Sequence, residues 1–146
     1  MFRLNQIDEN HIQFSGSIED TIFEKESFKD EMYNLQDRIE NEDVFGQVED
    51  KIYNKTFVDM INPQVNVSKI SHKITDVNVD EEHDYVYGTM EILDTTEGKV
   101  IKELMKHNCL NYMKATVSCI GNYDDKSSDQ NKFHINDFIT FNLKVD

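Results

Sequence analysis

Residues 133–145, FHINDFITFNLKV, constrain the fold more than any other segment of this chain. Apolar and polar residues alternate along it, which predicts a strand with one face buried against a core. The apolar face carries Phe133, Ile135, Ile139, Phe141, Leu143 and Val145. Asp137 interrupts this face, so we expect its carboxylate to be paired, capped by backbone amides or placed at a bulge. If Phe138 is exposed beside Thr140 on the other face, that surface is a candidate contact site.

The same period of two predicts further strands at 11–18, 44–48, 65–79, 85–93 and 115–120. We expect 11–18 to be the first strand and Gly121 to end the last of these five. The alternation of the 65–79 segment steps by one residue between Ile74 and Val77, which indicates a bulge. The acidic residues at 80–84 predict a turn that joins 69–79 and 85–93 as an antiparallel hairpin. Residues 49–63 are predicted to be an irregular excursion.

Two segments have helical spacing instead. Residues 24–42 place Phe28, Met32, Leu35 and Ile39 on one stripe. Residues 98–108 follow a candidate N-cap at 94–96, and Gly98 should weaken their first turn; their expected apolar stripe is Val100, Ile101, Leu104 and Met105. About six strands and two helices predict an α+β fold, a mainly antiparallel β-sheet or barrel.

Length and charge narrow the class of protein. A chain of 146 residues predicts a single domain, 1–146. The net charge of −14 opposes binding to nucleic acid and anionic membranes. The first residues lack a signal-peptide core and no apolar run could span a bilayer, so we expect a soluble intracellular product. Cys109 and Cys119 are predicted to be small buried residues, and no motif indicates a metal or cofactor.

In order and spacing, the chain resembles the prohead maturation proteases of tailed bacteriophages. Their SHKI-x-D, VYG and ILDT motifs correspond to Ser71–Ile74 with Asp76, Val86–Gly88, and Ile92–Thr95. A glycine and a lysine-containing helix follow, here Gly98 and Lys99–Leu104. The family's nucleophile strand, VSSRG, resembles the chain from Val117 to Gly121, and its closing strand resembles the chain from Asp137 to Asn142. The resemblance implies a prohead-protease-like fold with Ser118 at the nucleophile position.

The sequence departs from the family at the residues that activate the serine. The family's general base is a histidine in a GELxHP-like motif, which aligns with residues 46–51 and places Asp50 at the histidine position. An alternative alignment places Asn62 there, before Pro63. The arginine of VSSRG is replaced by Ile120. A carboxylate, with an ordinary pKa of about 3.9, holds an abstracted proton too weakly to serve as this base.

The chain contains five histidines. His72 and His134 are the runner-up bases: His72 lies in the SHKI strand, and His134 follows the serine, where the herpesvirus assemblins, distant relatives in mechanism, place a second histidine. We expect His72 to have a core role and His134 to lie on a polar strand face. His11 and His83 are expected at the surface, and His107 at a helix C-terminus, where the dipole favours it.

The hypothesis from sequence is therefore a pseudoprotease: a non-catalytic structural or assembly component of a tailed-phage virion. Its expected partners are other virion proteins, such as capsid, portal or neck, tail or baseplate subunits, or an active protease that it regulates, within an oligomeric assembly. We expect it in the virion, and in the host cytoplasm during assembly. Two alternatives remain open: an active prohead serine protease that uses Ser118 with His72 or His134, and a non-viral intracellular adaptor.

Overall fold

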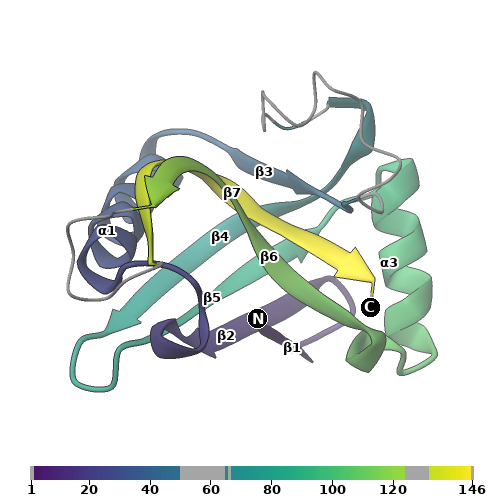
Figure 1. Cartoon of the computed structure of the whole chain (residues 1–146). Coiled ribbons are helices and arrows are strands. Elements are labelled where there is room, and N and C mark those ends of the chain that lie inside the picture. The colour runs from purple at the N-terminus through teal and green to yellow at the C-terminus, as the bar shows by residue number, and fades with distance from the viewer. Residues whose placement is uncertain (1, 50–64, 66, 124–131, 146) are drawn as a thin grey trace.

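A computed structural model describes residues 2–49, 65, 67–123 and 132–145 (Figure 1). The predicted excursion falls, from residue 50 onward, outside the described residues. Within these residues, 3₁₀ turns occupy Ile18–Asp20, Val67–Lys69 and Leu110–Tyr112. The remaining elements are β1 (Arg3–Gln6), β2 (His11–Ser17), α1 (Lys25–Asn41), β3 (Val44–Gln47), β4 (Ile70–Asp80), β5 (Tyr85–Ile92), α3 (Thr96–Lys106), β6 (Met113–Tyr123) and β7 (Phe133–Val145).

The strands form two antiparallel sheets that join into a barrel. The larger sheet has the order β1-β2-β5-β4-β3, and the smaller one pairs β6 with β7. At one junction Phe2 bridges Ala115, and at the other Val48 bridges Leu143. Figure 1 shows β6 and β7 crossing over the larger sheet, with α1 and α3 at opposite ends of the molecule. The predicted α+β class, with its antiparallel barrel, is confirmed.

The predicted hairpin is present, with two corrections near it. β4 and β5 pair antiparallel from His72↔Ile92 to Asp80↔Tyr85, and their register shifts between Ile74 and Asp76, as the phase step indicated. The predicted alternation at Val67 is wrong, because that residue lies in a 3₁₀ turn and is 81% exposed. Residues 11–18 are also not the first strand, since β1 precedes them.

Two bulges in the β6–β7 pair explain the interrupted face of the last strand. The register shifts between Ser118 and Cys119 and again between Ile120 and Gly121. Each shift exchanges the two faces of β7, so Asp137 is exposed and Phe138 becomes 2% exposed. A bulge, one of the three alternatives expected for Asp137, is present, and Phe138 does not provide the conditional contact site because its side chain is buried. Gly121 does not end the strand either, because β6 continues to Tyr123.

A cluster of phenylalanines forms the centre of the barrel. The ring of Phe141 lies 4.5 Å from Phe14, 5.0 Å from Phe138 and 5.3 Å from Phe2, between ring centroids. All four side chains are almost fully buried. Burial of each such ring stabilises the fold by roughly 1.5–3 kcal/mol. The predicted stripe of α1 joins this core through Phe28, Met32 and Leu35, with Ile39 packed at its edge.

Helix α3 spans Thr96–Lys106, two residues earlier than the predicted segment 98–108, with its N-cap within the predicted 94–96. Thr95 is its N-cap, and the Oγ1 atom accepts a hydrogen bond of 3.0 Å from the amide of Gly98. A Cβ on Gly98 would overlap the carbonyl oxygen of Leu93, so the glycine permits a close approach of helix and strand. Ile101 and Met105 are buried, but the predicted stripe is wrong at Val100, which is exposed.

Helix α1 closes the part of the barrel that β3 does not reach. β3 pairs only with the Ile70–Ile74 half of β4. Beyond that point α1 packs against β4, and the Nε2 amide of Gln36 donates to the carbonyl of Val77 at 2.9 Å. The helix therefore lies in the gap between β4 and β7.

Side chains of α1 also bind the backbone of β7. The amide of Ile135 donates to Oγ of Ser27 at 3.2 Å, and the amide of Phe138 donates to Glu31 at 3.3 Å. The guanidinium of Arg38 donates to the carbonyl of Phe138 at 2.9 Å and to the next carbonyl at 3.1 Å. These groups satisfy an edge that would otherwise lack a partner strand.

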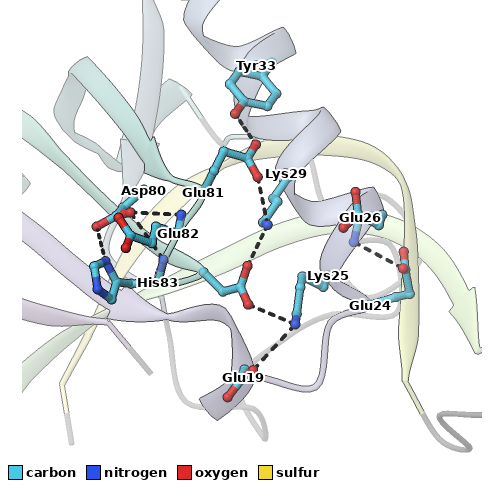
Figure 2. Close-up of polar contacts among 11 residues, drawn as sticks. Glu19, Glu24, Lys25, Glu26, Lys29, Tyr33, Asp80, Glu81, Glu82 and His83 are labelled. Atoms are coloured by element: carbon cyan, nitrogen blue, oxygen red, sulfur yellow. Dashed lines mark hydrogen bonds and ion pairs between the residues drawn. The ribbon is translucent and has the colours of Figure 1, made fainter.

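A charge cluster holds the β4–β5 turn against α1 (Figure 2). Nζ of Lys29 lies 2.6 Å from Asp84 and 2.9 Å from Glu81, while its side chain is only 7% exposed. The hydroxyl of Tyr33 donates to Glu81, and Lys25 contacts Asp84 at 2.9 Å. Hydrogen bonds from Lys29 and then Lys25 lower the pKa of Asp84, and those from Tyr33 and then Lys29 lower the pKa of Glu81.

We predict that Lys29→Met lowers the free energy of unfolding by about 1–3 kcal/mol, because it leaves Asp84 without its shortest ion pair. Since both carboxyl pKa values are lowered by folding, the stabilisation is complete above about pH 4 and is lost as pH falls below that. Urea unfolding at neutral and acidic pH measures both effects, and the variant should lose less stability on acidification than the original protein.

The matched control is Lys25→Met, which removes a cation that also contacts Asp84 but from a side chain that is 40% exposed. We expect a smaller loss, because solvent already screens that pair. Equal losses in the two variants would contradict a special role for the buried lysine.

Candidate functional site

Ser118 lies in β6 directly opposite Thr140 of β7, next to the first bulge. Its side chain is partly buried. The next cross-strand pair on the same side of the two strands is Thr116 with Asn142. Thr116, Thr140 and Asn142 are all buried. The candidate nucleophile therefore belongs to a strip of four short polar side chains that spans β6 and β7.

One member of this polar strip has an unused hydroxyl. Oγ1 of Thr116 is buried and has no hydrogen-bond partner in the part of the chain that the structure describes. Asn142, in contrast, accepts a hydrogen bond of 3.1 Å from the amide of Gln47, and its Nδ2 lies 3.4 Å from Glu49. The strip is thus tied to the end of β3.

His72 is fully buried and uses both ring nitrogens within the fold. Nε2 lies 2.8 Å from the carbonyl oxygen of Phe141, and Nδ1 lies 2.8 Å from Oγ of Ser71. A carbonyl can only accept, so Nε2 carries the proton, and Nδ1 accepts from the Ser71 hydroxyl. Burial lowers the pKa of His72 to about 4, although the bond to Phe141 opposes the shift. This histidine is a neutral link between β4 and β7, as its predicted core role requires.

Gly46 makes room for this link. It pairs with His72 across β3 and β4. A Cβ at this position would overlap both Nε2 of His72 and the carbonyl oxygen of Phe141. The glycine that opens the family's GELxHP-like motif thus has a packing role here. The residues at the histidine position of that motif, Asp50 or in the alternative alignment Asn62, lie outside the described residues.

His134 lies too far along the sheet to serve Ser118. It pairs with Asn122, four residues beyond the serine, which is roughly 13 Å at 3.3 Å per residue. Its Nδ1 atom faces Glu24 at 3.8 Å. A general base needs a heavy-atom distance of about 3 Å. His72 and His134, the two runner-up bases, therefore both contact groups other than Ser118.

The other three histidines lie near carboxylates on the surface. Each has a ring nitrogen within 4 Å of an acidic side chain: His11 at 2.8 Å from Asp8, His83 at 2.9 Å from Asp80, and His107 at 3.8 Å from Glu103. His107 is the C-cap of α3, as predicted. All five histidines of the chain are described, and each contacts groups other than Ser118.

The neighbours of Ser118 offer no activated nucleophile. Burial raises the pKa of the Cys119 thiol to about 11, with the charges of Asp137 and Glu31 adding to it. A thiol with this pKa remains protonated at neutral pH and reacts slowly. Cys109 and Cys119 are only partly buried, which corrects the prediction that both are buried. Ile120, at the family's arginine position, is exposed.

Two properties of the described residues bear on metal binding and on membrane insertion. Within them, no group of three or more His, Cys, Asp or Glu side chains is arranged to hold a metal ion. No described helix is long and apolar enough to cross a membrane.

Comparison with solved structures adds a match in fold. No family model matches the chain, and no curated protein matches it. Among solved structures, the capsid assembly protease gp21 of bacteriophage T4 is similar, with a TM-score of 0.66 and 10% sequence identity over 99% of this chain and 90% of that one. The chain has a prohead-protease-like fold. The resemblance first seen in short motifs therefore extends over the whole barrel.

Sequence reasoning missed several residues of this site. The family motifs drew attention to Ser118 and the histidines, but nothing indicated that Thr116, Thr140 and Asn142 would form one buried polar strip with the serine. The cross-strand register decides that grouping, and the two bulges set the register. A signal was present in the unusual density of Thr, Ser and Asn within otherwise apolar strands.

We predict that the His72 ring stays neutral, with its proton on Nε2, from pH 8 down to about pH 5, because its pKa is about 4. Nitrogen–proton correlation NMR of the histidine rings measures both the tautomer and the titration. In the unfolded chain the same ring takes up a proton near pH 6.5. Stability is therefore lost as pH falls from about 6.5 towards 4. A titration midpoint above pH 6 in the folded protein would contradict the buried link.

Proposed function

We propose that this protein is a non-catalytic component of tailed-phage assembly that binds other virion proteins through a prohead-protease-like barrel. The observation that carries the proposal is the position of the two runner-up bases: His72 is buried, neutral and hydrogen-bonded on both ring nitrogens, and His134 pairs four residues along the sheet from Ser118, beside Glu24. The fold match to a capsid assembly protease supports a role in phage assembly.

The chemistry of acyl transfer explains why this arrangement favours binding over cleavage. A serine hydroxyl attacks a peptide only when a positioned base takes its proton and later returns it to the leaving amine. His72 cannot take the proton, because Nδ1 already accepts from Ser71 and burial opposes a charge on the ring. Ile120, at the family's arginine position, has no charge with which to stabilise developing negative charge.

The proposed partners are the structural proteins of the same phage: capsid, portal or neck, and tail or baseplate subunits. A barrel retained without catalysis would serve as a binding module within an oligomeric assembly. The protein would meet these partners in the host cytoplasm during assembly and remain with the virion. A net charge of −14 favours positively charged protein surfaces over nucleic acid or anionic lipid.

We predict that the purified protein does not cleave the capsid or scaffold proteins of its phage. Intact-mass and peptide mass spectrometry after incubation is the measurement, with Ser118→Ala as the matched control. Assembly should be unchanged by Ser118→Ala. Asp50→His should yield little or no proteolysis, because catalytic groups that act as a unit are strongly non-additive.

A product that appears with the original protein and disappears with Ser118→Ala would overturn the proposal. It would favour the alternative, an active prohead serine protease, and would make the region around Ser118 the first place to search for a base. Co-purification with virions in stoichiometric amounts, without cleavage, is the expected result.

A further inference from the structure

The outer face of β5 presents two adjacent exposed tyrosines. Tyr85 and Tyr87 are 37% and 39% exposed, and they alternate with the buried residues Val86 and Gly88. Side chains alternate between the faces of a strand, so both rings lie on the outer surface of the five-stranded sheet. Among the described residues, neither hydroxyl has a hydrogen-bond partner and neither ring stacks on another aromatic ring.

Small polar and acidic residues surround these rings. The neighbours of Tyr85 are Asp80 on β4 and Ser17 on β2, and the neighbours of Tyr87 are Asn78 and Ser15. None of the four is basic. We call this set of six residues the tyrosine face. It combines rigid aromatic surface with adaptable hydrogen-bonding groups, a composition typical of protein-binding surfaces.

Two acidic side chains, Asp76 and Asp80, lie on or beside this face. Asp76 is exposed and lies next along β4, opposite Thr89. Asp80 forms its short ion pair with His83 rather than with a lysine or arginine. Of the basic residues of the same sheet, Lys73 is paired with Asp43, and Arg3 on β1 lies directly opposite Ser15, at the edge of the tyrosine face.

We propose that the tyrosine face docks an arginine- or lysine-bearing segment of a partner protein. The proposal rests on the binding role above and specifies the chemistry of the partner. A guanidinium over each ring is attracted by the cation–π interaction, and the nearby carboxylates add attraction. A second copy of this chain is disfavoured as the occupant, because two molecules each carrying a charge of −14 repel one another.

The test measures binding of a fluorescein-labelled peptide of alternating arginine and serine by fluorescence anisotropy, at about 50 mM and about 150 mM salt. The variant Tyr85→Thr/Tyr87→Thr keeps the net charge and the preference for strand conformation. We expect it to bind the peptide about tenfold more weakly than the original protein, the effect of losing roughly 1.4 kcal/mol. Asp76→Asn should weaken binding severalfold, more at low salt.

The matched control is Tyr112→Thr/Tyr123→Thr, which removes two exposed tyrosines elsewhere without changing charge. It should bind as the original protein does, and a glutamate–serine peptide should not bind at all. Equal weakening in both double variants, or in neither, would show diffuse charge attraction and overturn the proposal. Self-association in sedimentation that Tyr85→Thr/Tyr87→Thr abolishes would assign the face to a second copy and also overturn it.

The result of the peptide-binding test can be distinguished from the result of the cleavage test. Ser118 lies in the smaller sheet, whereas the tyrosine face lies on the larger one. Ser118-dependent cleavage would refute the non-catalytic role and leave the peptide result unchanged. Loss of the peptide effect would refute the docking face and leave the absence of cleavage unchanged.

Discussion

The barrel depends on the way one helix takes the place of a strand. β4 and β7 both have backbone groups facing the gap that the short β3 leaves open, and unpaired buried amides or carbonyls cost free energy. Side chains of α1 satisfy these groups on both sides, through Gln36 towards β4 and through Ser27, Glu31 and Arg38 towards β7. The apolar stripe of the same helix fills the space between the sheets. The same helix therefore closes the barrel and contributes to its hydrophobic core.

The other half of the same gap is closed by β3 and His72. The imidazole crosses from β4 to the carbonyl of Phe141 through the space that Gly46 leaves open. Phe141 in turn pairs with Val117, the residue before Ser118. His72 thus holds the strand that lies opposite Ser118. Its burial and its two hydrogen bonds make it suited to holding β7 in register and unsuited to exchanging protons.

The proposed binding role separates the functions of the two sheets. The smaller sheet holds the polar strip around Ser118, of which the other three side chains are buried. The larger sheet exposes tyrosines on its outer face beside carboxylates, in a chain whose charge repels anions over long range. If both proposals hold, the barrel has kept the architecture of a protease while its contacts with other proteins occur on a surface away from the serine.

Local sequence patterns were enough to predict most of the elements and a prohead-protease-like fold. Alternation placed β2, β5 and β7, helical spacing placed α1, and the phase step after Ile74 located a bulge, because these signals arise from which side of a local segment meets the core. The tertiary structure alone decided the burial of Phe138, the exposure of Asp137 and Val100, and the polar strip beside Ser118. Those features depend on cross-strand register and on which face a neighbouring element covers, and both are set by residues distant in the chain. For the same reason, His72 could be recognised as a core residue from its strand, but its link to Phe141 could not.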